Sequence, residues 1–387
     1  MIPYGRQDIN QEDIDAVVDV LNSDFLTQGS VVPAFEKSIA NYCNAQYAIA
    51  VNSATSALHI ACLSLGVTSG DIVWTTAITF VASANCALYC GASIGFVDID
   101  PLTCNISVEH LTEKLALAEK NNDLPKVVIP VHLCGQSCDM KAIHALSMQY
   151  GFRVIEDASH AIGGKYSGEP IGNCYYSDIT VFSFHPVKII TTGEGGMALS
   201  NDIKLANRMQ LLRSHGITRD VNEMTHDSEG PWYYQQIALG YNYRMTDIQA
   251  AMGLSQLRRL DEFVCKRNKI AKRYDSLLAS LPVVVTGQKL ENYSSFHLYV
   301  IRLKTEEITK THAVVFKELR DNGIGVNLHY IPVYRQPYYE QLGFKIGHCP
   351  VAERYYAEAI SLPMYPGLTE MQQDEVVSAL NCVLLGC

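Results

Sequence analysis

The sequence predicts an α/β protein: a mostly parallel, seven-stranded sheet flanked by helices, followed by a smaller C-terminal α/β domain. Short runs of β-branched residues alternate with helical patterns between residues 47 and 199, which is typical of parallel sheets covered by helices. The chain has 387 residues and 48% hydrophobic content, enough to bury a large core. A second, shorter alternation follows the long helical segment that starts at residue 246.

Two helices are predicted before the sheet begins. Gln11–Leu21 has helical periodicity, and Pro33 is expected to open a second helix that carries Phe35 and Ile39 on one face. The turn-rich segment 24–29 separates the two helices.

The sheet is predicted from seven short apolar runs, with helical patterns between them. Ligands of such sheets gather beyond the carboxyl ends of the strands, so we expect a binding crevice there. The predicted strands are Tyr47–Val51, Asp71–Thr75, Ser93–Val97, Val127–His132, Arg153–Glu156, Ile179–Phe184 and Met197–Leu199. The predicted helices between them are Ser56–Leu65, Val81–Tyr89, Val108–Lys120 and Lys141–Tyr150.

A long helical segment is predicted to join the two domains. Asp202–His215 forms a helix before it, and a stretch rich in Gly, Tyr and polar residues covers 217–243. The segment itself, Thr246–Leu281, is expected to break near Leu260. The predicted domains are residues 1–255 and residues 256–387.

The smaller domain is predicted to contain at least two strands and one helix. The strands are Phe296–Leu303 and a run that ends in Leu328-His329-Tyr330, and the helix is Lys310–Asn322.

Charge and hydropathy exclude some classes of binding partner. The formal net charge is −10 and there is no block of Lys or Arg, which argues against nucleic acid and anionic membranes as partners. The N-terminus lacks the apolar stretch of a signal peptide, and no run of eighteen apolar residues occurs, so we expect a cytoplasmic protein that does not enter the membrane. An anionic ligand must then be held by groups gathered locally.

Twelve cysteines are scattered through apolar surroundings. The closest pairs, Cys86/Cys90 and Cys134/Cys138, have no matching Cys or His pair nearby. This pattern favours buried thiols in a reducing compartment over a zinc site, and we predict no metal.

The run Val181–Gly196 brings one lysine, Lys188, from an apolar strand into a turn crowded with small residues. A lysine at the end of a buried strand is costly unless its amine is used, because desolvation lowers the pKa of the amine and makes it nucleophilic. Schiff-base chemistry requires such an amine. The alternative is an ordinary surface lysine in a loop.

Two more strand ends carry polar groups suited to a ligand. Ser53-Ala54-Thr55 opens a helix, where backbone N–H groups and the helix dipole favour a phosphate; the alternative is a plain Ser/Thr N-cap. Asp157 ends an apolar strand, where its carboxylate can pair with a ring nitrogen and keep that nitrogen protonated; the alternative is a helix cap. Phe80 follows a third strand and can stack on a flat ring or belong to the core.

Taken together, these positions fit a site for pyridoxal phosphate (PLP). Lys188 would hold the cofactor as a Schiff base, Asp157 would hold the pyridine nitrogen and Phe80 would stack on the ring. The predicted phosphate seat is formed by Ala54, Thr55 and Ser183.

Over essentially its whole length the chain resembles the DegT/DnrJ/EryC1/StrS family of sugar aminotransferases. The resemblance implies an aspartate-aminotransferase-like fold (PLP fold type I). The motifs that carry it are Asn52–Leu58, Asp157–Ala161, Phe182–His185 with Lys188, Thr192–Gly196, Arg213–Gly216 and Gly240–Met245.

The resemblance also implies roles for individual residues. Lys188 is expected to be the Schiff-base lysine, Asp157 the partner of the pyridine nitrogen, and His160 a neighbour of the ring hydroxyl. In this family the segment around residues 241–244 reaches the active site of the neighbouring subunit. Asn242 is therefore expected to complete the phosphate seat in trans, within a homodimer that shares its active sites.

Substrate contacts are expected from arginines and from aromatic stretches. Arg244 is expected to hold the diphosphate of a nucleotide sugar as a planar donor fork. The stretches Gly230–Tyr234, Phe296–Tyr299 and Asn327–Tyr334 with Gln336–Tyr339 suit a nucleotide sugar, although they also fit a packed tyrosine-rich surface. The predicted substrate contacts are Tyr4, Arg213, Arg244, His329 and Tyr330.

The resemblance is greatest to family members that transfer an amino group from L-glutamate to a 4-keto-6-deoxy UDP-N-acetylhexosamine on the way to pseudaminic acid. Lys188 would act there as general acid and base. The alternatives are another 4-keto or 3-keto nucleotide sugar, such as a pentose, and a non-catalytic binding or regulatory member. Sugar dehydratases of the family carry histidine in place of the lysine, and Lys188 argues against that activity.

Overall fold

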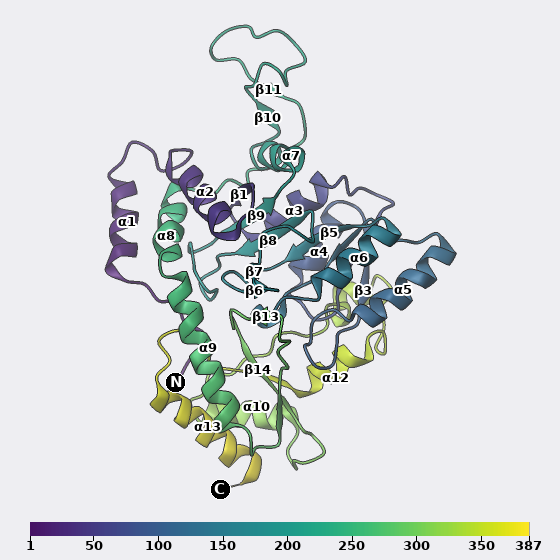
Figure 1. The fold of residues 1–387 in the computed structure, drawn as a ribbon, viewed down its shortest axis with the longest axis vertical. Coiled ribbons are helices and arrows are strands. Elements are labelled where there is room, and N and C mark those ends of the chain that lie inside the picture. Colours follow the sequence, from purple (N-terminus) through teal and green to yellow (C-terminus); the bar gives the residue numbers. More distant parts are fainter. Residues whose placement is uncertain (387) are drawn as a thin grey trace.

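The computed structural model describes residues 1–386, and a seven-stranded sheet forms its centre (Figure 1). The strand order is β1-β9-β8-β5-β4-β2-β3. Neighbouring strands are parallel except where β9 pairs with β1 and β8, so the sheet is mostly parallel, as predicted. The strands are β1 (Tyr47–Val51), β2 (Ile72–Thr76), β3 (Ser93–Val97), β4 (Val127–Ile129), β5 (Arg153–Asp157), β8 (Ile179–Ser183) and β9 (Gly196–Ser200).

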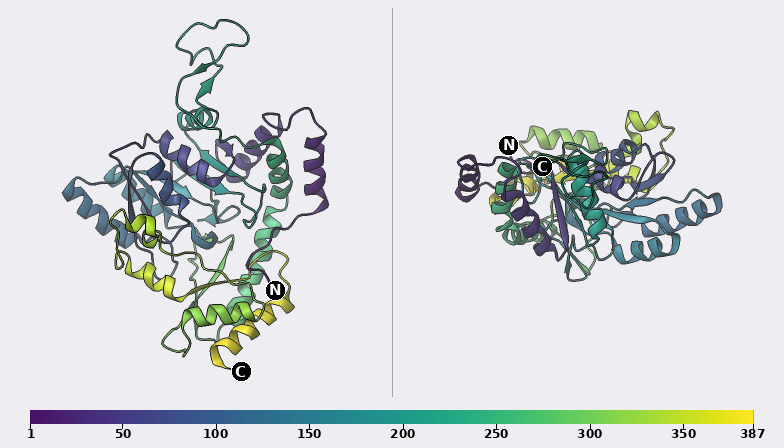
Figure 2. Two further views of the ribbon diagram at one scale, coloured as in Figure 1. Left: turned by 180° about the vertical axis from the view of Figure 1, so that it is seen from behind. Right: turned by 90° about the horizontal axis from the view of Figure 1, so that it is seen from above.

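Helices cover both faces of this sheet because successive side chains of a strand point to opposite faces, and here both faces are apolar. Ile49 and Val51 of β1 pack in one cluster with α3 (Ala54–Ser64), α4 (Ala82–Tyr89) and α7 (Ile203–Arg213). Ala48 and Ala50 pack on the opposite face, against α2 (Val31–Cys43) and α8 (Asp247–Leu257). Views from behind and from above show helices on both sides of the sheet (Figure 2). The remaining flanking helices are α5 (Val108–Asn121) and α6 (Met140–Tyr150).

The N-terminal helices confirm the sequence pattern with one correction. Helix α1 (Gln11–Leu21) begins with a reciprocal cap between Asn10 and Asp13. Helix α2 begins at Val31, so Pro33 is its third residue and does not open it. The helix tolerates Pro33 there because the first N–H groups of a helix have no intrahelical acceptor.

The long helical segment breaks where the sequence predicts. Helix α8 ends at Leu257 and α9 (Leu260–Leu277) begins three residues later. Phe263, in the first half of α9, packs in the core of the large sheet, whereas Tyr274 packs in a second core. The division at residues 255 and 256 stays a prediction.

The second core lies under a three-stranded antiparallel sheet of order β12-β14-β15. Both chain ends lie at the side of the molecule where α13 is found (Figure 1). The strands and helices of this part are β12 (Val283–Val285), β14 (Tyr299–Leu303), β15 (Ala359–Leu362), α10 (His312–Asp321), α11 (Pro337–Glu340), α12 (Pro350–Glu358) and α13 (Glu370–Leu385).

The strand predicted to end at Leu328-His329-Tyr330 is not formed. Asn327 makes only an isolated bridge to Ser361, after which the chain turns away from the sheet. His329 bonds the Ser361 hydroxyl instead, with 2.8 Å between His329 Nδ1 and Ser361 Oγ, and Tyr330 lines a cavity. Tertiary contacts of His329 and Tyr330 thus replace the backbone hydrogen bonds of the strand that the apolar pattern predicted.

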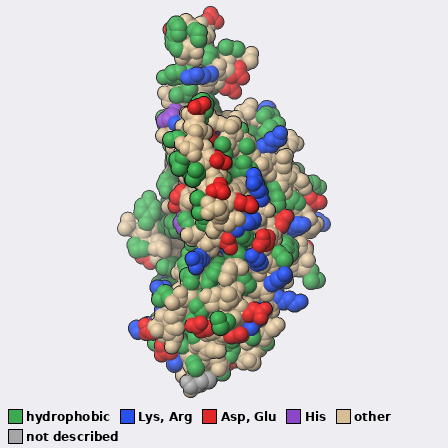
Figure 3. Space-filling model, turned by 90° about the vertical axis from the view of Figure 1, so that its left-hand side faces the viewer, with side chains coloured by type: hydrophobic (Ala, Val, Ile, Leu, Met, Phe, Trp, Pro, Cys, Tyr) green, Lys and Arg blue, Asp and Glu red, His purple; other side chains and the backbone are tan. Residues whose placement is uncertain are grey.

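Residues 217–239 project from the body as a long hairpin (Figures 1 and 3). Its ladder is short, β10 (Ile217–Thr218) paired with β11 (Gln235–Gln236), and its exposed side chains include Val221, Trp232 and Leu239. The remaining short elements are β6 (Lys165–Tyr166), β7 (Glu169–Pro170), β13 (Asn292–Tyr293) and the 3-10 turns Leu133–Gly135 and Val333–Arg335.

Residues 1–386 contain neither a membrane-spanning helix nor a cluster of metal-ligating side chains. No helix there is both long and apolar enough to cross a bilayer. No group of three or more His, Cys, Asp or Glu side chains there is arranged to hold a metal ion.

Candidate active site

A cavity of about 860 Å³ opens beyond the ends of β1, β2, β5 and β8, at the edge of the sheet where the sequence predicts a crevice. Ten of the predicted site residues line it. They are Tyr4, Ala54, Thr55, Phe80, Asp157, His160, Ser183, Lys188, His329 and Tyr330.

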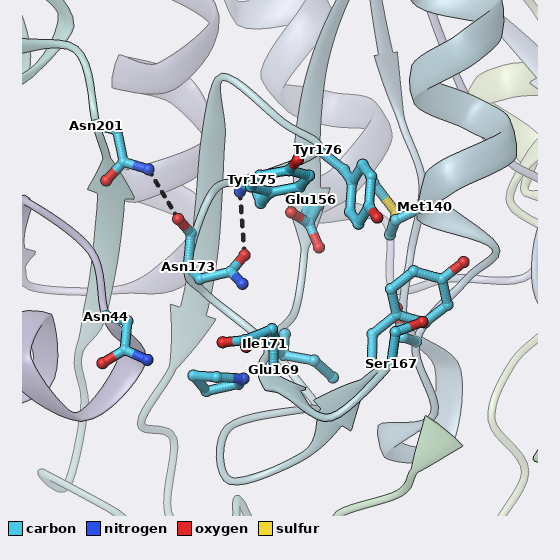
Figure 4. Close-up of a pocket in the computed structure, with 13 residues that line it drawn as sticks. Asn44, Met140, Glu156, Ser167, Glu169, Ile171, Asn173, Tyr175, Tyr176 and Asn201 are labelled. Atoms are coloured by element: carbon cyan, nitrogen blue, oxygen red, sulfur yellow. Dashed lines mark hydrogen bonds between the residues drawn. The ribbon is translucent and has the colours of Figure 1, made fainter. Parts of the chain in front are cut away.

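A second cavity, of about 530 Å³, contains none of the predicted residues (Figure 4). The side-chain amides of Asn201 and Asn173 are already hydrogen-bonded to backbone groups. Asn201 donates from Nδ2 to the carbonyl of Asn173 at 2.8 Å, and Oδ1 of Asn173 accepts the N–H of Tyr175 at 3.0 Å. These bonds hold the loop that forms the wall. The first cavity is therefore the candidate active site.

Lys188 stands in a turn whose two ends are tied together by Phe184. The N–H of Phe184 donates to the carbonyl of Gly195 at 2.9 Å, and the N–H of Thr192 donates to the carbonyl of Phe184 at 3.0 Å. The hydroxyl of Thr192 donates to the carbonyl of Glu194 at 2.7 Å, so this side chain closes the turn. The loop thereby holds Lys188 at the cavity wall.

Burial lowers the pKa of Lys188 to about 8, because the cavity wall desolvates the ammonium form. The carboxylate of Asp157 opposes this shift, since it favours the charged amine. A larger fraction of the amine is therefore neutral near physiological pH than for an exposed lysine. This is the electronic state that a Schiff-base lysine needs.

Asp157 ends β5 and is buried, and donors reach both of its carboxylate oxygens. Ser83 on α4 donates to Oδ2 at 2.6 Å. Ser159 donates to Oδ1 from its hydroxyl at 2.5 Å and from its N–H at 3.1 Å. These hydrogen bonds replace the water that the carboxylate loses on burial, and they fix its orientation. The carboxylate is thereby oriented to pair with one cation in the cavity.

The first turn of α3 forms an anion seat. Ser53 caps the helix by accepting the N–H of Ser56 at 3.1 Å, which leaves the N–H groups of Ala54 and Thr55 without intrahelical acceptors. Gly196 of β9 packs directly against this turn: a Cβ at Gly196 would lie 2.5 Å from the nitrogen of Ala54. Only glycine allows this approach, and the pairing of Gly196 with Ser183 brings that hydroxyl beside the seat.

His160 is held neutral inside the cavity wall. The N–H of Cys134 donates to its Nδ1 at 3.3 Å, so Nε2 carries the hydrogen of the neutral ring and faces the hydroxyl of Tyr330 at 3.1 Å. Burial lowers the pKa of His160 well below its usual value, and Lys188 and His329 lower it further. The ring therefore acts as a neutral donor and packing surface.

Two further histidines share this wall. Burial lowers the pKa of His329 to about 3, and its ring lies 5.5 Å from that of Tyr4. His297 was not among the predicted site residues, yet it is buried, lines the cavity and lies 4.4 Å from His160 between ring centroids. Its place in the Phe296–Tyr299 stretch was the signal that could have found it.

The residues that orient other side chains were not predicted from the sequence either. Ser83 belongs to no predicted motif, because an isolated serine in a helix has no pattern that predicts its partner. Ser159 lies inside the predicted run Asp157–Ala161, but no role was predicted for it. Glu194 and Gln249 line the mouth, and Gln249 donates from Nε2 to the carbonyl of Glu194 at 2.8 Å. Phe80, predicted to stack on the cofactor, is 59% exposed at the mouth, with its ring 6.2 Å from that of Tyr330.

Three predicted residues do not line the cavity of the single chain. Asn242 and Arg244 belong to a run held along the end of β1, where the N–H of Asn52 donates to the carbonyl of Tyr243 at 2.8 Å; Asn242 is exposed. Arg213 pairs with Glu36 and donates to the carbonyl of Ala50 at 2.7 Å.

The family model described as the DegT/DnrJ/EryC1/StrS aminotransferase family matches residues 7–381. The chain belongs to this family.

Relatives of this DegT/DnrJ/EryC1/StrS aminotransferase include enzymes named for different sugars. It is 38% identical over 386 residues to the UDP-4-amino-4,6-dideoxy-N-acetyl-beta-L-altrosamine transaminase of Campylobacter jejuni, covering 99% of this chain and 98% of the relative. It is 37% identical over 383 residues to the GDP-perosamine synthase of Caulobacter vibrioides, covering 98% and 97%.

Solved structures are similar over the same length. PseC of Helicobacter pylori, an aminotransferase of pseudaminic acid biosynthesis, superimposes with a TM-score of 0.91 at 30% identity and full coverage of both chains. The PLP form of the sugar aminotransferase Spr1654 of Streptococcus pneumoniae has a TM-score of 0.88 at 30% identity, covering 99% of this chain and 98% of that one. The fold is that of PLP fold type I.

This aminotransferase uses PLP, as its family does. The residues of the cavity fit that cofactor. Lys188 offers an amine of lowered pKa, Asp157 offers a buried, oriented carboxylate, and the anion seat has two free N–H groups in a cradle that any side chain at Gly196 would fill. PLP supplies an aldehyde that binds amines and a ring that withdraws electrons from the carbon beside the nitrogen.

Proposed function

We propose that this enzyme transfers an amino group from L-glutamate to the keto carbon of a 4-keto-6-deoxy UDP-N-acetylhexosamine, the reaction that yields UDP-4-amino-4,6-dideoxy-N-acetyl-beta-L-altrosamine for pseudaminic acid. One observation carries the chemistry: Lys188, whose pKa is lowered, lines the same cavity as Asp157, whose carboxylate is oriented by hydrogen bonds. The observation that supports the sugar is the similarity to the transaminase of Campylobacter jejuni and to PseC over almost the whole chain.

Each group around the cavity has a role in this proposal. The Nζ of Lys188 holds the cofactor and, once released, moves a proton to and from the carbon that loses or gains nitrogen. Asp157 keeps the pyridine nitrogen protonated, and His160 contacts the side of the pyridine ring that carries the hydroxyl group. Ala54, Thr55 and Ser183 bind the phosphate. Phe80 at the mouth covers the ring.

The sugar nucleotide is proposed to lie against the outer wall. Tyr4, His329 and Tyr330 offer rings and hydrogen-bonding groups to the hexose, and His160 and His329 are neutral there, which suits hydroxyl and keto groups. Arg244 binds the diphosphate, and Arg213 is the remaining proposed contact. Because their pKa values are low, His160 and His329 add no positive charge for the diphosphate, and the proposal assigns that charge to the arginines.

We propose a homodimer in which the partner supplies Asn242 and Arg244 to the cavity. Both residues are near the end of β1 and outside the cavity of their own chain. The adjoining hairpin exposes Val221, Trp232 and Leu239, and exposed apolar side chains of this kind are typical of an interaction surface. A second copy of the chain is the occupant that completes the phosphate seat.

A reaction in the cytoplasm is part of the proposal. The buried cysteines among residues 1–386 form no disulfide, as expected in a reducing compartment.

A second candidate substrate is a GDP-linked keto sugar, because the identity to GDP-perosamine synthase is nearly the same. The test is to incubate purified enzyme with PLP, L-glutamate and either the UDP-linked or the GDP-linked 4-keto-6-deoxy sugar, and to follow 2-oxoglutarate and the mass of the sugar nucleotide. The proposal expects amination of the UDP sugar at a kcat/KM at least about tenfold higher, a difference of about 1.4 kcal/mol in transition-state binding. A preference for the GDP sugar, or for a 3-keto sugar, would overturn it.

A further inference from the structure

One arginine is enclosed in the interior of the enzyme, on the helix that passes from the core of the large sheet to the second core. Arg267 of α9 is 1% exposed. Its hydrogen bonds within residues 1–386 go to backbone carbonyls, and its Nε is buried there without a partner. Burial lowers the pKa of Arg267 to about 9, so the guanidinium is still charged near neutral pH. A buried cation is costly, and this one calls for a role that an apolar side chain could not fill.

The Nη1 atom of Arg267 binds two separate segments of the chain. It donates to the carbonyls of Phe296 at 3.1 Å and His297 at 3.2 Å, and to the carbonyl of Met364 at 3.1 Å. The N–H of Met364 in turn donates to the carbonyl of Tyr4 at 2.9 Å. His297 and Tyr4 both line the cavity of the candidate active site. One guanidinium therefore connects two parts of the cavity wall.

The turn that carries His297 has an uncommon backbone conformation. Phe296 has a φ of 46°, in the left-handed region that bulky residues rarely adopt and that the surrounding structure must impose. The hydroxyl of Ser294 accepts the N–H of Phe296 at 3.1 Å, and the hydroxyl of Ser295 donates to the carbonyl of His160 at 2.8 Å. Together with the guanidinium, these bonds place the ring of His297 in the wall, 4.4 Å from the ring of His160 between centroids.

We propose that Arg267 is a positioning residue of the active site, which holds His297 and, through Met364, Tyr4 where they contact the keto sugar. The contact with the sugar rests on the proposed function, whereas the positioning does not. Burial lowers the pKa of His297 well below its usual value, so its ring is neutral in the wall. A neutral imidazole there suits the hydroxyl and keto groups of a sugar.

Labelling of the holoenzyme with diethylpyrocarbonate tests the positioning without any substrate. The reagent acylates neutral imidazoles, and His59 of α3 is the internal comparison because it is 4% exposed, as His297 is. In Arg267→Met, His297 should react at least about tenfold faster than in the wild type, because its turn opens locally, while His59 keeps its rate. Arg273→Met is the matched control. Arg273 lies on the same helix but bonds Asp374 at 2.7 Å, so its loss should change neither rate.

Two results of this labelling would overturn the proposal. Equal acceleration at His59 and His297 would mean that Arg267 supports only the overall stability of the fold. An unchanged rate at His297 would mean that Arg267 does not hold the wall. Arg267→Lys keeps the cation on a shorter side chain and serves in place of Arg267→Met if that variant does not fold. His297 should again react faster in it, and His59 should not.

Steady-state kinetics connect the position of His297 to the sugar. His297→Gln and Arg267→Lys should each lower kcat/KM for the keto sugar by about tenfold. The dissociation constant of PLP should stay unchanged, because the hydrogen bonds that hold Asp157 and the turn of Lys188 remain.

The double variant shows whether Arg267 acts through His297. Its loss in kcat/KM should be smaller than the product of the two single effects, since the second substitution removes a contact that the first has already displaced. Full additivity, or weaker binding of PLP in Arg267→Lys, would contradict the assignment. A wild-type enzyme that aminates no keto sugar would refute the proposed function instead, and the labelling would still decide the role of Arg267.

Discussion

Ser83 donates a 2.6 Å hydrogen bond to Oδ2 of Asp157 across 74 residues of chain. Oδ1 of the same carboxylate accepts two bonds from Ser159, one from its hydroxyl and one from its backbone N–H. The two oxygens are therefore supported unequally. Oδ2 depends on a single side chain of the described protein, whereas Oδ1 keeps a backbone donor whatever residue stands at position 159.

Ser83→Ala should consequently weaken cofactor binding more than Ser159→Ala. Removing the hydroxyl of Ser83 leaves a buried carboxylate oxygen with one donor fewer, which costs about 1–3 kcal/mol. We expect the dissociation constant of PLP to rise by about tenfold or more in Ser83→Ala, since 1.4 kcal/mol is a factor of ten. Fluorescence titration of both variants with PLP measures the difference. Equal effects would contradict the unequal support of the two oxygens, and an unchanged dissociation constant in Ser83→Ala would mean that Ser83 does not orient the carboxylate.

The lowered pKa of Lys188 predicts how its reactivity changes with pH. Only the neutral amine reacts with an acylating reagent, so in enzyme stripped of PLP the modification rate of Lys188 should rise through a midpoint near pH 8. Lys317 is the internal comparison, because its hydrogen bond to Asp321 raises the pKa of this exposed amine. Its midpoint should lie above 10.5, the value of an unperturbed lysine. Peptide mapping after timed acetylation reads both midpoints.

The Asp157→Asn variant tests the cause of that pKa. The carboxylate favours the charged amine, so its removal should shift the midpoint of Lys188 to lower pH and leave that of Lys317 in place. An upward shift at Lys188 would show that the interaction between the two groups has the opposite sign.

Arg213 has two competing roles, and stability separates them. The sequence predicts a substrate contact, while in the structure Arg213 pairs with Glu36, which also accepts the N–H of Ala50 at 2.8 Å. Arg213→Ala leaves this poorly solvated carboxylate without its cation, so we expect a loss of about 3 kcal/mol in unfolding free energy. Urea unfolding measures that loss. A raised KM with unchanged stability would favour the substrate role instead.

The sequence predicted the large sheet well because each strand is apolar on both faces and is bounded by a helical pattern. All seven predicted runs are strands of one sheet, and errors at their ends are small; β4, for example, stops at Ile129 instead of reaching His132. The break before α9 was also found. Repeated local periodicity carries this information.

The smaller domain and the support of the site were less predictable, for physical reasons. The run that ends in Tyr330 is apolar and aromatic like a strand, but the bond between His329 and Ser361 and the position of Tyr330 in the cavity wall override that preference. Ser83 and His297 act through partners distant in sequence, and a single sequence contains no record of such pairs. Motif residues were found because several of them occur in one short run.

Asn242 and Arg244 raise a question that only an assembled enzyme can answer. They are absent from the lining of the cavity in their own chain, although family resemblance predicts that they serve one. We consider a mixed dimer in which one chain lacks Lys188 and the other lacks Arg244. If each cavity takes Lys188 from one chain and Arg244 from the other, one of its two cavities keeps both residues.

Mixing inactive Lys188→Ala with Arg244→Ala should therefore restore activity. In a mixed dimer one cavity receives both substitutions and the other receives neither, and random exchange makes half of the dimers mixed, so about one quarter of wild-type activity should return. Lys188→Ala mixed with Asp157→Ala is the matched control: both residues line the cavity of a single chain, so every cavity stays damaged and no activity should return. Fluorescence transfer between labelled subunits must confirm exchange. Exchange without recovery would mean that Arg244 serves its own chain.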